Sequence, residues 1–129
     1  MSTLSLSKNP AMTLEQQRSA TAWRFAQEGV ALSDQYKDLA KATPALIMNN
    51  GLLQTLAFFE DKGKPHHKVL ASHLRRWVMS RAGGSDQDIG FLPFMEILLQ
   101  ADSQQYRQAS EEALLLLRWL RQFAAAVEV

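Results

Sequence analysis

Three histidines are the residues of this chain whose type and spacing could do chemistry. His66, His67 and His73 share one short segment, and His66 and His73 are seven residues apart, so they lie on one face if the segment is helical. No His-Glu-x-x-His pattern accompanies them. The segment is also rich in lysine and arginine, whose positive charge repels a metal ion. We therefore expect no metal site, but partly buried or boundary histidines that add positive charge below about pH 6.5.

Other catalytic groups are missing or ambiguous. The chain contains no cysteine, which excludes a thiolate zinc site, a disulfide and a cysteine nucleophile. Gly83 and Gly84 lack the surrounding pattern of a phosphate-binding loop, and the paired acids Glu111 and Glu112 are typical of helix termini. We expect no enzymatic activity and no cofactor. A helical hydrolase that uses one of the three histidines stays an alternative, which metal analysis of the purified protein would test.

The net charge of +1 hides an uneven distribution of charge along the chain. Residues 62–81 contain six basic residues and neither aspartate nor glutamate, whereas the rest of the chain beyond residue 81 has seven acidic residues and three arginines. The middle of the chain is therefore locally basic, and its C-terminal third is acidic. The six basic residues are Lys62, Lys64, Lys68, Arg75, Arg76 and Arg81.

A helical wheel gathers four of these cations within an arc of roughly 120° and places apolar residues opposite them. One interpretation is a solvated face, whose cations near the helix C-terminus interact favourably with the helix dipole. The other is a face that binds a phosphate backbone. Because no base-reading device is recognisable, such a contact would be independent of nucleotide sequence. The four cations are Lys64, Lys68, Arg75 and Arg76, and the apolar residues are Leu70, Leu74, Trp77 and Val78.

The spacing of apolar residues predicts helices throughout, and no stretch alternates apolar and polar residues as a strand would. We expect an all-α fold: one domain over residues 1–129, a compact bundle of about five or six helices, with residues 1–12 as a flexible arm. Residues 42–59 carry no charge, but their polar groups argue for a core helix and against a membrane span. Helix boundaries are predicted from capping, proline and glycine signals. The predicted starts are Thr13, Thr43-Pro44, Pro65, Phe91 and Ser103, and the breaks are Gly63 and residues 82–85.

The central segment carries a recognisable motif. Residues 46–59 read Leu-Ile-Met-Asn-Asn-Gly-Leu-Leu-Gln-Thr-Leu-Ala-Phe-Phe and follow Pro44. This segment resembles the signature of the small all-helical subunit of the type III-B CRISPR RNA-targeting (Cmr) complex. Residues 13–20, residues 70–77 and the last segment, which contains Arg118-Trp119-Leu120-Arg121-Gln122-Phe123-Ala124, resemble that family in the same order. The resemblance covers most of the chain from Thr13 on.

The resemblance implies a non-catalytic, cytoplasmic protein of antiviral defence. Such subunits stack beside the backbone subunit of the complex and contact the phosphates of guide and target RNA, so the implied partners are other Cmr subunits, RNA and neighbouring copies of the chain, and not a membrane. We expect Leu46, Ile47, Leu53 and Leu56 of the motif to form core and not to contact RNA. The candidate RNA-binding residues come from the charge pattern, and only Arg18 is also matched by a family segment: Lys62, Lys64, Lys68, Arg75, Arg76, Arg81, Lys41, Lys37 and Arg18.

Two further expectations concern assembly and RNA. The acidic C-terminal third of one copy could face the basic middle of the next, which would build a head-to-tail stack that weakens with salt. Reversing the charges of Arg75 and Arg76 is expected to weaken RNA binding in the complex while the free chain stays folded. The alternative function is a helical protein–protein adaptor without nucleic-acid contact. A steep salt dependence of RNA binding would favour the RNA-contacting subunit over the adaptor.

Overall fold

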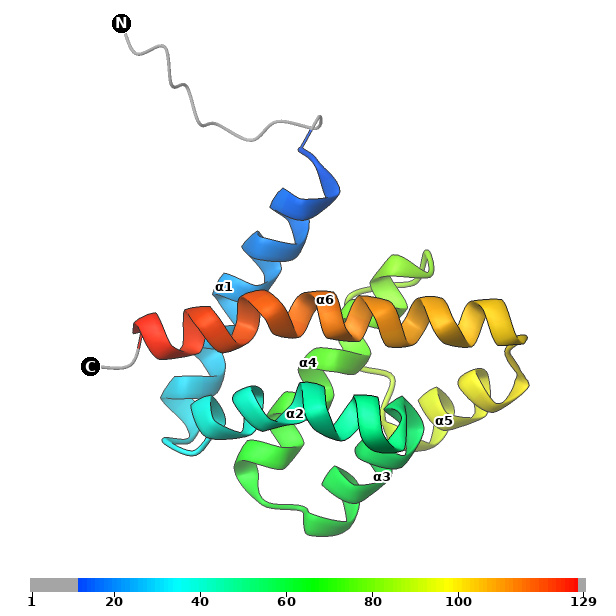
Figure 1. Ribbon diagram of the computed structural model, residues 1–129, viewed down its shortest axis with the longest axis horizontal. Coiled ribbons are helices and arrows are strands. Elements are labelled where there is room, and N and C mark those ends of the chain that lie inside the picture. Colours follow the sequence, from blue (N-terminus) through cyan, green and yellow to red (C-terminus); the bar gives the residue numbers. More distant parts are fainter. Residues whose placement is uncertain (1–11, 128–129) are drawn as a thin grey trace, which may run out of the picture.

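The longest described helix, at residues 103–127, extends across the molecule, and three of the other helices pack against it (Figure 1). The computed structural model describes residues 12–127, so the arm expected at residues 1–12 lies outside the described part except for Met12. Within that part the fold is all-helical without strands, as predicted. The six helices are α1 (Leu14–Leu32), α2 (Tyr36–Asn50), α3 (Leu52–Lys62), α4 (Pro65–Arg81), α5 (Phe91–Gln100) and α6 (Ser103–Val127).

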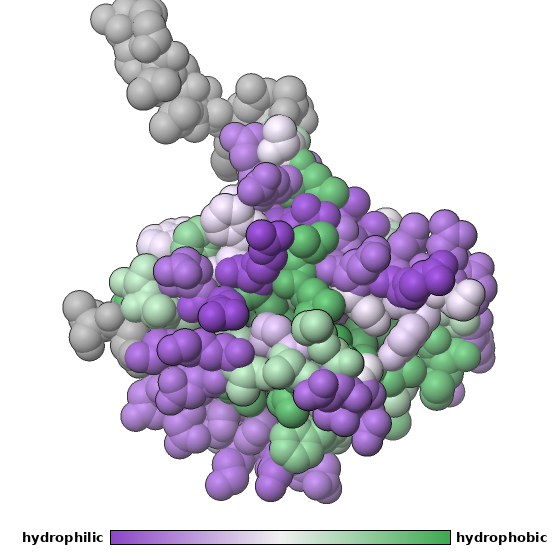
Figure 2. Space-filling model, in the orientation of Figure 1, coloured by the Kyte–Doolittle hydropathy of each residue, from purple (hydrophilic) through white to green (hydrophobic). Residues whose placement is uncertain are grey.

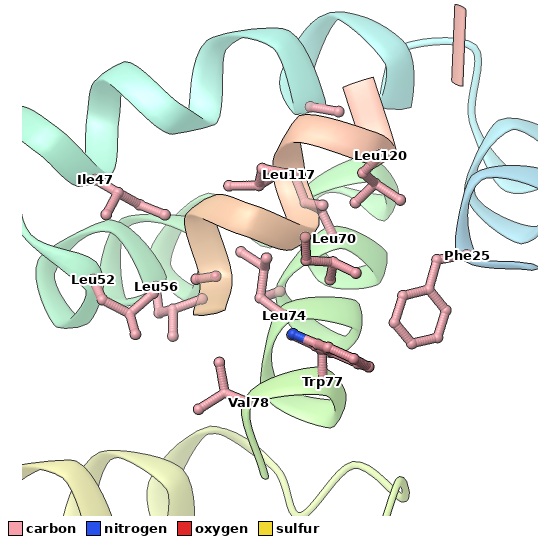
Figure 3. Packing of buried hydrophobic residues seen from close by; sticks show 14 of the residues in the cluster. Phe25, Ile47, Leu52, Leu56, Leu70, Leu74, Trp77, Val78, Leu117 and Leu120 are labelled. Atoms are coloured by element: carbon pink, nitrogen blue, oxygen red, sulfur yellow. The ribbon is translucent and has the colours of Figure 1, made fainter. Parts of the chain in front are cut away.

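One connected core joins the helices. The helix α6 packs against α1, α2 and α4. Figure 3 shows Leu117 and Leu120 of α6 facing Leu70 and Leu74 of α4, with Phe25 of α1 at one end. The apolar side of α4 is buried as predicted, with Leu70, Leu74, Trp77 and Val78 in the core. Of the motif residues expected in the core, Ile47 and Leu56 are buried, whereas Leu46 and Leu53 are only partly buried. The buried motif residues are Ile47, Leu52, Leu56 and Phe59.

Short-range capping signals located several helix starts correctly. Thr13 and Gln16 form the predicted capping box: the Thr13 hydroxyl accepts a hydrogen bond from the Gln16 backbone N–H at 3.1 Å, and the Gln16 side chain accepts one from the Thr13 N–H at 2.9 Å. The helix α4 begins at Pro65 as predicted. The cap of α6 is Asp102 and not Ser103, because the Asp102 carboxylate accepts the Gln105 N–H at 2.8 Å.

The predicted helix start at Thr43-Pro44 is wrong. The helix α2 begins at Tyr36 and continues through Pro44 to Asn50. An internal proline removes a backbone hydrogen bond and costs about 3 kcal/mol. Packing offsets that cost, because the buried side chains of α2 recur every three or four residues along one face: Tyr36, Ala40, Thr43 and Ile47.

A second correction concerns the helix expected to run from Pro44 to Gly63. It is interrupted at Gly51, whose φ of 87° and ψ of 161° lie in a region that is essentially open only to glycine. The Gly51 N–H closes α2 on the Ile47 carbonyl at 2.7 Å, and its own carbonyl accepts the Thr55 N–H at 3.1 Å to open α3. This turn allows Ile47 and Leu52, on successive helices, to reach the same core.

Gly29 leaves α1 continuous and makes room for an aromatic ring. A Cβ atom at this position would lie 2.4 Å from the Tyr36 ring, which is itself fully buried. We expect Gly29→Ala to lower the free energy of unfolding by about 1–3 kcal/mol, because overpacking exceeds the gain of ~1 kcal/mol in helix propensity. Denaturant unfolding measures the change, with the exposed Ala31 of the same helix mutated to glycine as the control for propensity. A stabilised Gly29→Ala variant would contradict the close packing of Tyr36.

The helix α5 is the least covered of the six. Only Phe94 and Leu98 are buried, whereas Leu92 and Leu99 are 70% and 68% exposed. Among residues 12–127, no helix combines the length and apolar character that crossing a membrane requires.

Candidate nucleic-acid interface

Six of the nine candidate cations fall into two groups, one at the start of α4 and one in its second half. This helix has 17 residues, so its ends are about 24 Å apart. Lys62, Lys64 and Lys68, called the turn lysines below, surround the turn from α3 into α4. Arg75, Arg76 and Arg81 lie in its second half. Figure 2 shows hydrophilic side chains along the lower end of the molecule, where Figure 1 places the α3–α4 turn.

Arg75 is buried and bound to a carboxylate of the same chain. It is 7% exposed, and its Nε and Nη2 atoms each donate to one oxygen of Asp88 at 2.7 Å. Burial alone would raise the pKa of Asp88, but the hydrogen bonds from Arg75 and from the Gly90 N–H outweigh it and lower the pKa to about 2. The expectation that Arg75 is a free cation on an open face is therefore wrong. The physical reason is that the chain after α4 folds back and places Asp88 against it.

Arg18 and Arg81 share a second carboxylate, that of Glu112 on α6. Arg18 donates from Nε at 3.1 Å and from Nη2 at 2.9 Å, and the Arg81 Nε lies 3.7 Å away. The Trp77 indole N–H donates to the same carboxylate at 3.0 Å. Burial would raise the pKa of Glu112, but these partners lower it below its usual value. Glu112 thus connects α1, α4 and α6. Both arginines are paired, although they were expected to be free cations.

Arg76 is also engaged within the chain. Its Nε donates to the Asp86 carbonyl at 2.8 Å, and its Nη1 lies 3.6 Å from the Glu28 carboxylate. Its guanidinium carbon lies 4.7 Å from the centre of the Phe25 ring, a cation–π contact. The candidate arginines therefore connect helices and loops. This role could not be predicted from residues 62–81, because that segment contains no acidic residue with which they could pair.

The lysines behave differently. Lys41 and the turn lysines are exposed, and within residues 12–127 no carboxylate lies at ion-pairing distance from any of these four ammonium groups. Lys37, one turn before Lys41 on α2, is half-buried and interacts with neighbouring groups. Among the nine candidate cations, those that the structure leaves exposed and without an ion pair to a carboxylate of residues 12–127 are thus lysines.

The histidines do not add charge to this surface in the way expected. His73 is fully buried, stacked on Phe25, and held between the Tyr36 hydroxyl at 2.7 Å and the Glu28 carboxylate at 2.6 Å. Burial lowers the pKa of His73 to about 4 despite Glu28, and burial with the charge of His66 and neighbouring lysines also lowers the pKa of His67. Both rings therefore take up a proton only at a lower pH than expected.

A groove of about 840 Å³ lies between the end of α4, α5 and α6. Its lining includes Met79, Ile97 and Leu115 together with the paired groups Arg18 and Glu112. None of the three histidines lines it. In the described part of the chain no three side chains of histidine, aspartate or glutamate are placed to hold one metal ion.

The sequence pattern did not reveal the three carboxylates that lie against the candidate arginines, those of Glu28, Asp88 and Glu112. Arg18 and Glu112 are 94 residues apart, and no local pattern connects them. It also gave no role to Phe58, a residue of the central motif that is 43% exposed and lies beside Lys62. Only the spacing of Phe58 and Lys62, four residues apart on a helix, carried a signal.

Comparison with known proteins identifies the family. The model of the family described as CRISPR-associated protein (Cas_Cmr5) matches residues 14–127, which include all six helices. The "CRISPR system Cmr subunit Cmr5" of Thermus thermophilus is 30% identical over 96 residues, which cover 72% of this chain and 75% of that relative. The resemblance drawn from the central motif is thus confirmed, and the chain belongs to the Cas_Cmr5 family of CRISPR-associated proteins.

Proposed function

We propose that this protein is a non-catalytic, cytoplasmic small subunit of a type III-B CRISPR ribonucleoprotein in antiviral defence. It stacks beside the backbone subunit and contacts guide and target RNA through their phosphates, without sequence preference. Membership of the Cas_Cmr5 family supports the place in a Cmr complex. The observation that carries the RNA contact is the group of four exposed lysines that no carboxylate of residues 12–127 neutralises.

The chemistry of these lysines fits phosphate and not bases. An ammonium group is a mobile point charge without the planar geometry that reads a base edge, so it binds a phosphate of any nucleotide. Each phosphate contact releases condensed counterions and makes affinity depend on salt. The turn lysines lie close together, since the Lys68 side chain approaches to 4.0 Å from the position of a Cβ on Gly63. They can therefore follow successive phosphates of one strand.

The arginines keep a secondary place in this proposal. Arg18, Arg75, Arg76 and Arg81 are held by carboxylates or carbonyls of the same chain, so binding RNA would require them to exchange partners. Stacking of copies through opposite charge is restricted in the same way, because Asp88 and Glu112 are engaged internally. The acidic groups left for a neighbouring copy include Glu96, Asp102 and Glu111, which are exposed.

Removing the turn lysines should reduce the salt dependence of RNA binding. We expect the triple variant Lys62→Gln, Lys64→Gln, Lys68→Gln to bind a short single-stranded RNA more weakly at low salt, with the slope of log K against log salt smaller by about 2. Fluorescence anisotropy of the purified full chain at several salt concentrations measures both quantities. The matched control removes three exposed arginines of α6 in the same way: Arg107, Arg118 and Arg121. Equal effects of the two triple variants would argue against a defined lysine site.

A protein–protein adaptor without nucleic-acid contact is the second candidate, favoured by the exposed apolar side chains of α5. It shares the fold and the family but predicts no salt-dependent RNA binding. The same titration separates the two functions, because an adaptor should give neither measurable affinity at low salt nor a slope. Association with other Cmr subunits is compatible with both.

A further inference from the structure

We propose that Phe58 is a stacking platform for one unpaired base of RNA, and that Lys62 and Lys64 hold the phosphates on either side of that base. This inference rests on the proposed function, since it places one nucleotide on the surface that is proposed to bind RNA. It goes beyond it by adding a contact to a base. The site consists of Phe58 and the turn lysines at the α3–α4 turn.

The position of the Phe58 ring is the first argument. Its neighbour Phe59 is fully buried, whereas Phe58 is 43% exposed. The ring is supported from within the protein: its centre lies 6.1 Å from that of Phe59 and 6.1 Å from that of the buried His67, which meets it at 90°. Phe58 is therefore held by the core on one side, and on its exposed part the Lys62 side chain lies over the ring. A stacking base would take the place of this flexible side chain.

The charges around the ring are the second argument. Lys62 follows Phe58 by one helical turn, and its ammonium nitrogen lies over the ring, 5.5 Å from the ring centre, in a cation–π contact that a stacking base would displace. Lys64 and Lys68 stand on the other side of the turn, four residues apart at the start of α4. Among the acidic residues of α3, Glu60 projects from the far side of the helix at about 200° from Phe58, and Asp61 flanks the ring at about 60°. Among the residues of α3 and of the α3–α4 turn, the turn lysines thus outnumber the Asp61 carboxylate beside the ring.

The combination of an exposed ring and nearby lysines favours single-stranded RNA as the partner. An exposed aromatic ring among lysines is the arrangement by which proteins hold single-stranded nucleic acid, with a base on the ring and the backbone on the cations. Stacking requires a free base face, so it favours an unpaired nucleotide over a duplex. An apolar protein surface would cover Phe58 but would desolvate the lysines without neutralising them. Charge complementarity therefore favours RNA as the occupant.

The experiment compares two RNAs of equal length, one single-stranded and one a duplex, binding to the purified full chain at low salt. We expect Phe58→Leu to weaken binding of the single strand by about 5- to 10-fold and to leave duplex binding and the salt slope unchanged, because it removes the ring but no charge. Phe58→Tyr keeps a ring and should bind as the wild type does. Trp23→Leu is the matched control, since Trp23 is also 43% exposed but lies on α1 against Phe123.

The outcomes separate the stacking platform from the proposed function. If Phe58→Leu binds the single strand as tightly as the wild type while the lysine variant binds more weakly, the platform is overturned and the phosphate contact stands. If the wild type binds neither RNA, the proposed function and the platform both fall. If Phe58→Leu leaves RNA binding intact but weakens association with other Cmr subunits, Phe58 contacts protein and the proposal is overturned.

Discussion

Replacing Arg75 with methionine is expected to lower the free energy of unfolding by about 3 kcal/mol. Methionine keeps much of the buried aliphatic length but removes two charge-assisted hydrogen bonds of 2.7 Å to Asp88. The Asp88 carboxylate, whose side chain is only 26% exposed, is then left without its partner. The Gly90 N–H, which donates to the same carboxylate at 2.9 Å, depends on that position, so the whole segment between α4 and α5 should loosen. Urea unfolding of the two proteins measures the loss.

A double-mutant cycle assigns the loss to the ion pair. Asp88→Asn removes the charge and keeps the shape, and we expect it to cost less alone than Arg75→Met, because the amide still accepts hydrogen bonds. The double variant should be more stable than the sum of the single effects predicts, by about 1–3 kcal/mol. If the Arg75→Met variant is as stable as the wild type, the ion pair does not hold Arg75 in place, and Arg75 is free to bind RNA.

The burial of Arg75 against Asp88 also changes what a charge reversal at Arg75 would measure. Arg75 and Arg76 were expected to tolerate it without loss of the fold. A glutamate at position 75 would face Asp88 in a buried site, so the free chain should unfold more easily. Lost RNA affinity in that variant would then report on folding. The turn lysines are exposed and without ion pairs in residues 12–127, so they are the positions at which charge reversal tests binding alone.

Local signals predicted the parts of the fold that depend on a few neighbouring residues. The capping box at Thr13 and the proline start of α4 depend on contacts within one turn of helix, and both were predicted correctly. Pro44 shows the limit: a start signal was overridden by a buried face that extends over the whole of α2. Gly51 lies inside a segment for which one continuous helix was predicted, and only its positive φ reveals the turn that it makes.

The candidate site was predictable in kind but not residue by residue. A helical wheel groups Arg75 with Lys64 and Lys68, because it describes directions around a single helix. It cannot tell that residues 82–90 return to cover one end of that helix, or that Glu112 lies 35 residues from Trp77 in the chain and within 3.0 Å of it in the fold. The positive charge of this surface could be predicted from the local excess of basic residues. Which of these residues are paired arginines and which are exposed lysines depends on tertiary contacts.

Acidification from pH 7 to pH 5 is expected to destabilise the chain through His73. In the unfolded chain this histidine binds a proton near its ordinary pKa of 6.5, but in the folded protein burial lowers its pKa to about 4. Between these values the unfolded state binds more protons, so the stabilisation is complete above pH 6.5 and is lost as the pH falls towards 4. The expected loss at pH 5 is on the order of 2 kcal/mol. Asp88 does not contribute in this window, because its pKa of about 2 affects stability only below its ordinary value near 4.

His73→Gln tests whether this ring is the source of the acid sensitivity. The groups around it are the Tyr36 hydroxyl, the Glu28 carboxylate, the Arg76 guanidinium and the more distant Asp88. Since the carboxylate accepts from Nε2, neutral His73 accepts the Tyr36 hydroxyl at Nδ1, and protonation would remove that acceptor. The glutamine variant should be less stable than the wild type at pH 7, yet it should lose less stability between pH 7 and pH 5 in urea unfolding. An unchanged pH slope would assign the effect to another group, for which His67, whose pKa burial also lowers, is the next position to replace.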